Sequence, residues 1–157
     1  MSALAAIGAG TRSRREAGVR LLCGLLLPAV ACEPVREVEV ADSSAAISAL
    51  LGGVLLDDAP VWKTPGRVWV TVYLGEYRAE AADNPRLSVA ATRLGLTDRA
   101  FHALARGDAL LLGASSTGAD VDVPQVAVTL MRVSGVPVAP VDAPWPEARR
   151  GAGRGLR

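Results

Sequence analysis

The chain has 157 residues, which is enough for one domain with a buried core but too few for two. Half of the residues are hydrophobic and only 4% are aromatic, so the core must consist mainly of Val, Leu and Ala. No apolar run approaches the roughly 20 residues of a membrane-spanning helix, and two cysteines with one histidine do not suit a zinc site.

The formal net charge of +1 is unevenly distributed. Residues 21–142 hold nine Arg or Lys and fourteen Asp or Glu, a net of −5, whereas the two ends hold eight Arg and two Glu, a net of +6. Basic ends can bind nucleic acid or an anionic membrane. Because nearly all cations are Arg and Ala and Gly are abundant, we attribute the charge to compositional bias and expect solvated, disordered ends rather than a nucleic-acid site.

Residues 20–40, RLLCGLLLPAVACEPVREVEV, support two interpretations. Arginines, an apolar stretch and Ala-Val-Ala directly before Cys32 have the order of an export signal, which would make the protein a lipoprotein anchored to a membrane at Cys32. Against this, Ala29 stands where a lipoprotein signal usually has Leu, and Glu16 interrupts the basic region. Without lipidation at Cys32, we expect no association with a membrane.

The second interpretation is a pair of antiparallel strands. Residues 22–27 are an apolar run that stops at a proline, and residues 35–40 alternate valine with charge, so that the glutamates of this second strand face water. In this arrangement Cys23 lies opposite the region of Val40 and Cys32 lies in the loop, too far apart for a disulfide. Two reduced thiols suit a cytoplasmic protein, which is the compartment that we expect.

Capping residues predict three short helices. One follows Asp42, Ser43 and Ser44 and ends at a Gly-Gly pair, and a second starts at Asn84-Pro85 and ends at Gly95. Its buried stripe is expected to consist of Leu87, Ala90, Ala91 and Leu94. A third begins at residue 97 and closes at residue 107. Residues 123–133 fit either a helix opened by a proline or a strand with alternating apolar residues, and we favour the helix.

Further strands are predicted in the middle of the chain. Residues 54–56 and 61–63 are expected to be extended, and a type II turn over residues 64–67 leads into VWVTVYL at residues 68–74. DALLLG at residues 108–113 is typical of a buried strand, and the following ASSTGADVD of a loop. We therefore predict a single small α+β domain over residues 20–136, a mixed β-sheet with two or three short helices packed on it, between a disordered extension (1–19) and a disordered Pro/Gly/Arg tail (137–157).

The order of six short motifs, LLLPA, PVREVEV, LLGG, NPR, GDALLLG and DVDVP, resembles short bacterial and phage proteins that carry the domain of unknown function number three-eight-four-six. The resemblance covers about residues 20–133. It departs from that family in the long arginine-rich start and in GEYRAEAAD, where the family shows a tighter acidic glycine turn. The resemblance implies the strand interpretation of residues 20–40 and residues 1–19 as an extension, and it implies no activity.

Catalytic motifs are weak. GAGTRS lacks the third glycine of a phosphate loop, GASSTG is one residue too long for a nucleophile elbow, and the sole histidine, His102, is expected to be structural. The acidic loops hold oxygen ligands suited to magnesium or calcium, which leaves a metal-dependent enzyme as an alternative. These residues are Asp57, Asp58, Asp120 and Asp122. We expect them to be solvated turn residues, and we expect no metal site and no cofactor.

Asn84 and Arg86 are the predicted ligand-binding residues. An asparagine cap leaves helix amides directed outward, and an arginine in the same turn adds a fork of donors for a carboxylate or phosphate. The alternative is that Asn84 only caps its helix and Arg86 pairs with an acid. We expect a non-catalytic cytoplasmic accessory protein, of the kind that mobile elements encode, that binds a protein partner or a small anionic ligand.

Overall fold

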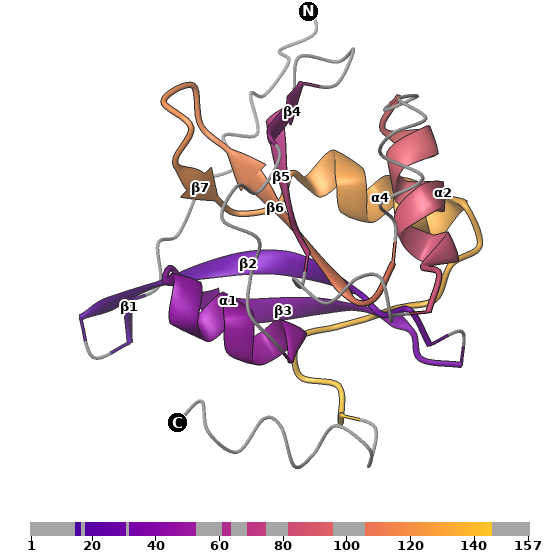
Figure 1. Cartoon of the computed structure of the whole chain (residues 1–157), viewed down its shortest axis with the longest axis horizontal. Coiled ribbons are helices and arrows are strands. Elements are labelled where there is room, and N and C mark those ends of the chain that lie inside the picture. The colour runs from indigo at the N-terminus through magenta and orange to yellow at the C-terminus, as the bar shows by residue number, and fades with distance from the viewer. Residues whose placement is uncertain are drawn as a thin grey trace, which may run out of the picture.

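The computed structural model describes residues 15–16, 18–30, 32–52, 61–63, 69–74, 82–95 and 106–145. They form one mixed β-sheet on which three described helices pack, so the predicted α+β domain is confirmed (Figure 1). The strands are β1 (Arg15–Glu16), β2 (Val19–Leu27), β3 (Val35–Ala41), β4 (Val61–Lys63), β5 (Trp69–Leu74), β6 (Ala109–Ala114), β7 (Asp120–Val121) and β8 (Val138–Ala139). The helices are α1 (Ser44–Leu51), α2 (Pro85–Arg93) and α4 (Gln125–Val133).

The sheet has the strand order β4-β5-β6-β2-β3-β8, with β1 added to β2 and β7 added to β6. Every pairing is antiparallel except that of β3 with β8, which is parallel. β2 therefore lies in the interior of the sheet, with β3 along one edge and β6 along the other. The C-terminal end of β2 is completely covered, since Leu25, Leu26 and Leu27 are at most 1% exposed.

The strand interpretation of residues 20–40 is confirmed. β2 and β3 pair antiparallel, and Cys23 lies opposite Glu39, one residue from the predicted Val40. Cys23 and Cys32 are both exposed, and they form no disulfide with each other. Apolar side chains on both faces of β2 are what a central strand requires, because helices cover both faces of this sheet.

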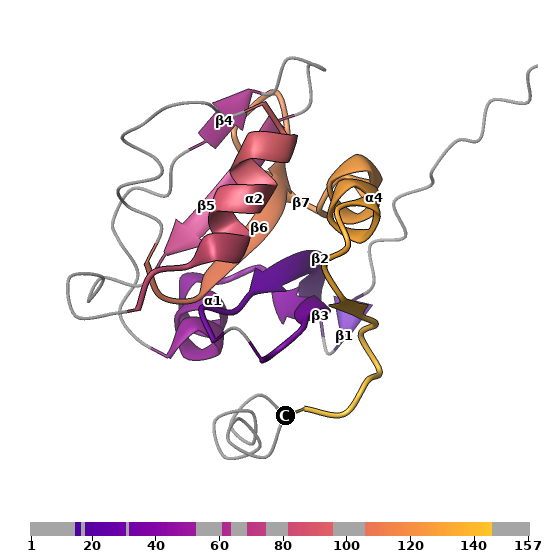
Figure 2. The same cartoon turned by 90° about the vertical axis from the view of Figure 1, so that its right-hand side faces the viewer.

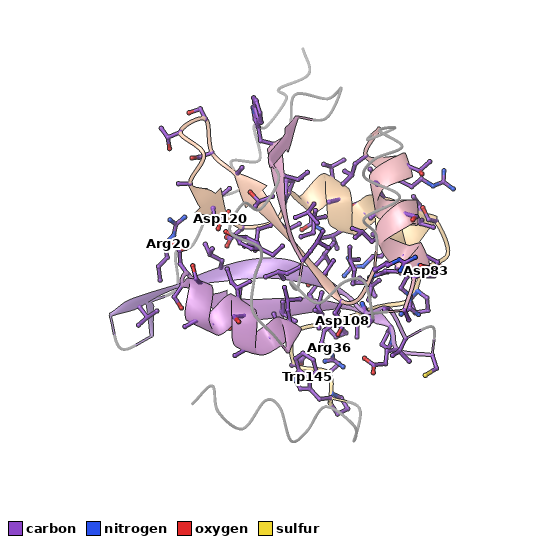
Figure 3. All side chains as sticks on the ribbon, in the orientation of Figure 1. Arg20, Arg36, Asp83, Asp108, Asp120 and Trp145 are labelled. Carbon is purple, nitrogen blue, oxygen red and sulfur yellow. The ribbon has the colours of Figure 1, made fainter. Side chains whose placement is uncertain are left out.

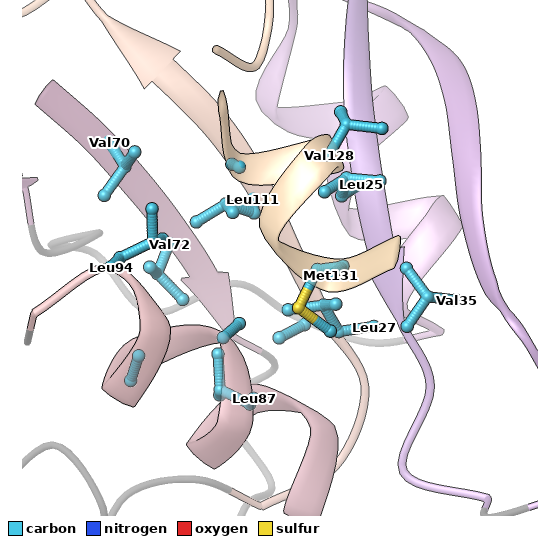
Figure 4. Packing of buried hydrophobic residues seen from close by; sticks show 14 of the residues in the cluster. Leu25, Leu27, Val35, Val70, Val72, Leu87, Leu94, Leu111, Val128 and Met131 are labelled. Atoms are coloured by element: carbon cyan, nitrogen blue, oxygen red, sulfur yellow. The ribbon is translucent and has the colours of Figure 1, made fainter. Parts of the chain in front are cut away.

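Helices cover the two faces unequally (Figure 2). Leu25 and Leu27 of β2 pack in a cluster with α2 and α4, which Figure 4 shows from close by. On the opposite face, Leu22 and Leu26 of β2 pack against Ile47 of α1. The described residues thus form three layers, and each of the four buried leucines of β2 contributes to one of two cores.

The predicted helix ends agree with the structure. Ser43 Oγ accepts a hydrogen bond from Ala46 N, and Gly52 closes α1 with a φ of 72°. α2 starts at the Asn84 cap and buries the predicted stripe. Residues 125–133 are helical, as favoured. A helix brings the apolar side chains of Ala127, Val128 and Met131 to one side, whereas a strand would place Ala127 and Val128 on opposite faces.

Three predictions need correction. The predicted bounds of the domain, residues 20–136, are too narrow, because Arg15–Glu16 form β1, which pairs with the start of β2, and Val138–Ala139 form β8 at the edge of β3. The predicted loop at residues 114–122 contains β7, because Asp120 and Val121 pair back onto β6. Glu37 was predicted to face water, but α4 lies over it, and Arg132 Nη2 of this helix is 2.6 Å from Glu37 Oε1.

Several other predictions fall outside the described residues. They are the extended segment 54–56 with Asp57 and Asp58, the type II turn at 64–67, and the third helix with its histidine. Among the residues that the structure describes, no helix is long and apolar enough to cross a membrane.

Removal of β2 is expected to unfold the protein, which tests the leader interpretation directly. A chain that begins at Cys32 lacks all four buried leucines of β2, each of which contributes about 1.5–3 kcal/mol. The loss of about 6–12 kcal/mol is comparable to the about 5–15 kcal/mol that stabilise a whole domain. We expect no cooperative thermal transition by circular dichroism, whereas a cooperative transition in the truncated chain would contradict the central role of β2.

Candidate binding surfaces

Arg36 is a buried arginine at the outer side of the sheet. It lies on β3, is only 4% exposed and pairs across the sheet with Leu26. Its Nη1 donates to the carbonyl oxygen of Ala143 at 2.5 Å, and its Nη2 donates to that of Pro144 at 2.7 Å. A buried charge is costly unless it is hydrogen-bonded, and these two carbonyl groups meet that requirement.

The segment bound by Arg36 is here called the C-terminal strap, residues 138–145. It begins as β8, in which Val138 pairs with Val35 and Ala139 with Arg36. It ends at Trp145, whose ring centroid lies 4.5 Å from the Arg36 guanidinium carbon (Figure 3). The cation thus lies over an aromatic face, which it is attracted to electrostatically.

The strap joins the two faces of the sheet. Val138 packs against the core that contains α2 and α4. Trp145 packs against the core that contains α1. The strap therefore passes around the outer edge of β3, and in Figure 2 the yellow chain leaves β8 below the sheet. Between these two anchors, Pro140, Val141 and Asp142 are exposed.

This surface was missed in the sequence, although one signal was present. The alternation of residues 35–40 predicts that Val38 and Val40 face inward, and Arg36 has the same parity. A charged residue on the buried side of a strand requires a partner. The partner itself is more than a hundred residues away along the chain, which no local pattern reveals.

A second polar cluster lies at the opposite end of β2, where Figure 3 labels Arg20 and Asp120. The Tyr73 hydroxyl donates a hydrogen bond to Asp120 Oδ2, and Arg20 Nη1 lies 3.6 Å from Asp42 Oδ2. Burial, the hydrogen bond to Asp120 and the negative charges of Asp120 and Asp42 raise the pKa of Tyr73 well above its usual value. The phenol stays protonated at neutral pH, so Tyr73 is a hydrogen-bond donor and not a base.

Asp120 and Asp122, which were weighed as metal ligands, have separate partners. Asp120 accepts from Tyr73, and Asp122 Oδ1 accepts from Cys23 N at 2.8 Å. Within the described ranges, no group of three or more His, Cys, Asp or Glu side chains is placed to hold a metal ion. In the GASSTG turn, Ser115 Oγ accepts from Ala119 N, so this hydroxyl closes the turn.

Asn84 joins three segments at the corner where α2 begins. Its Oδ1 accepts from Leu87 N, and its Nδ2 donates to the carbonyl oxygens of Leu27 at 2.9 Å and Gly107 at 2.7 Å. The residue is 1% exposed. Its amide therefore fixes the end of β2, the start of α2 and the start of β6, and it is oriented by the fold rather than toward solvent.

Arg86 lies beside Asn84 at the surface of the same corner. Its Nη1 donates to the carbonyl oxygen of Val30 in the β2–β3 loop at 3.0 Å. Next to Asn84 in the chain, Asp83 forms an exposed ion pair with Arg106, in which Oδ1 lies 3.3 Å from Nε. The backbones of the same two residues form an antiparallel bridge. An anion at this corner must compete with the Val30 carbonyl group for the guanidinium, and binding at Arg86 stays a prediction.

Comparisons with protein-family models, curated proteins and solved structures gave no match to this chain. The resemblance to the phage and bacterial family therefore depends on the order of the six motifs and remains a prediction.

The raised pKa of Tyr73 predicts a late ionisation. The protonated Tyr73 contributes fully to the stability of the folded state below about pH 10, where the tyrosines of the unfolded chain are also protonated. This contribution is lost as the pH rises above that value. In the variant Tyr77→Phe, Tyr73 is the remaining tyrosine. We expect its ultraviolet phenolate absorbance to rise near pH 10 only after unfolding in urea. A rise near pH 10 in the folded protein would contradict the buried hydrogen bond.

The Arg86 prediction can be tested with inorganic phosphate. We expect phosphate to shift the amide NMR signals around the start of α2, and Arg86→Ala to weaken this binding about tenfold, as the loss of one charge-assisted hydrogen bond does. The matched control is Arg93→Ala, which removes an exposed arginine from the last turn of the same helix. Equal binding by both variants would show that Arg86 is not the anion site.

Proposed function

We propose that the protein is a cytoplasmic accessory protein that binds another protein by strand addition at the outer edge of β3. In strand addition, an extended segment joins a sheet edge through backbone hydrogen bonds, and pockets along the edge supply specificity. The observation that carries the proposal is β8, which is such an addition made by the protein's own chain.

The chemistry of the edge also supports protein binding. Arg36 uses its guanidinium to bind two consecutive backbone carbonyl groups, and Trp145 covers the guanidinium plane. Backbone carbonyl groups are present in every extended peptide. A site built on them suits a segment of another protein better than a small metabolite.

The polar groups of the kind that enzymes use in catalysis hold the fold together here. Tyr73 is bound to Asp120, and Asn84 is bound to three backbone groups. Asp108 Oδ1 accepts from Ala29 N at 2.8 Å and fixes the β2–β3 loop. A structural role for these side chains favours a binding protein over an enzyme, and the resemblance to phage proteins favours an accessory role in a mobile element.

The cytoplasmic location is supported by the place of β2 in the sheet. Processing before Cys32, as in a lipoprotein, would remove a strand that pairs with both β3 and β6. The exposed Cys23 and Cys32, which form no disulfide with each other, also suit a reducing compartment. The proposal therefore includes retention of β2 in the mature protein.

Crosslinking in the native cells tests this function. A photoreactive phenylalanine analogue replaces Glu39, which is exposed on β3 beyond the residues paired with β8. We expect a covalent adduct between this chain and another cytoplasmic protein. Mass spectrometry of the adduct should still detect residues 19–27 of this chain. The matched control carries the analogue at Val133, which is 74% exposed at the end of α4. Equal adducts at both positions, or none at position 39, would refute strand addition at β3.

A further inference from the structure

We propose that the surface beneath the C-terminal strap recognises an extended, proline-containing segment of a partner protein that ends in an aromatic residue, and that the strap is an intramolecular competitor for it. This inference rests on the function proposed above and specifies the partner segment. The strap itself shows which chemistry the surface accepts, since it is seated there in the structure.

The surface makes three kinds of contact in a fixed order. The first is parallel backbone pairing, in which Val35 and Arg36 of β3 accept an incoming strand. The second is the pair of hydrogen bonds from Arg36 to two successive carbonyl groups, four and five residues further along the bound segment than Ala139. The third is an aromatic ring on the guanidinium, immediately after those carbonyl groups. This order defines both the direction and the length of the segment.

Prolines suit the bound segment for a physical reason. Pro144 is exposed but supplies a carbonyl group to Arg36, and as a proline it has a fixed φ and no backbone N–H. A proline also restricts the free segment to extended conformations, which lowers the entropy lost when it binds. The strap has a second proline, Pro140, where the chain leaves β8.

The aromatic residue supplies side-chain specificity. Two carbonyl groups on Arg36 identify an extended backbone but no particular sequence. Trp145 adds a ring that packs against the α1 core as well as the guanidinium, so it is the contact that depends most on residue type. A partner segment without an aromatic residue at this position would lose both interactions.

The strap can be exchanged because its ladder is short. β8 pairs with β3 through two residues, whereas β2 pairs with β3 through six. A tethered segment competes at an effective concentration in the millimolar range for a short flexible connection. A partner present at lower concentration therefore has to bind more tightly than the strap, and weakening the strap should favour the partner.

A labelled synthetic peptide of residues 136–145, VPVAPVDAPW, tests the inference by fluorescence polarisation on the full-length chain. We expect Trp145→Ala to bind this peptide about tenfold more tightly than the unmodified chain, because the ring–guanidinium contact no longer holds the strap. Trp69→Ala is the matched control, as Trp69 lies on β5 on the other side of β6 and β2. The peptide with its tryptophan replaced by alanine should not bind measurably.

A second strap variant keeps the test decisive if Trp145→Ala does not fold. Val138→Asp weakens β8 where it packs against the α2–α4 core and leaves Trp145 in place. Three outcomes overturn the inference: no peptide binding by the folded strap variant, equal binding of the peptide without tryptophan, or a dimer in which the strap is exchanged between two copies.

The crosslinking experiment separates this inference from the proposed function. If a partner is crosslinked at position 39 and the peptide neither binds the strap variants nor displaces that partner, strand addition stands and the proline–aromatic segment is wrong. If the peptide binds and no partner is crosslinked in cells, the surface has the stated specificity and the cellular role is wrong.

Discussion

Leucines occupy both faces of β2, with Leu22 and Leu26 directed toward α1 and Leu25 and Leu27 toward α2 and α4. This strand is the shared element of two cores that otherwise belong to opposite sides of the sheet. It also carries the backbone ladders to β3 and β6. Both candidate surfaces depend on it, because Asn84 is bound to the last carbonyl group of β2 and Arg36 is paired with Leu26.

Local patterns were sufficient for most of the elements. Alternation identified β3 and β5, capping residues identified α1 and α2, and a continuous apolar run identified β2 and β6. Each of these signals arises from residues that are neighbours in the chain. For β3, the inward side of Val38 and Val40 could also be predicted, since side chains of a strand alternate between its two faces.

β1 and β7 were missed although they pair with nearby residues, because each has only two residues. The other missed features depend on distant contacts. β8 has two residues and is a strand only because Val35 and Arg36 are available beside it. Asn84 was predicted as a cap, but its two donor bonds use carbonyl groups that lie before β6 and at the end of β2. Tyr73 and Asp120 are 47 residues apart in sequence, so nothing local indicates that one hydroxyl and one carboxylate meet.

The sheet joins the beginning of the chain to its second half, and this has a consequence during translation. β2 obtains its second neighbour only when residues 109–114 have been synthesised, which at about 5–20 residues per second takes on the order of ten seconds after β2 leaves the ribosome. During that interval one side of a leucine-rich segment has no sheet partner. Transiently exposed apolar segments of this kind are what chaperones bind. The region that most resembles a leader is therefore also one that stays incompletely paired until the second half of the chain has been made.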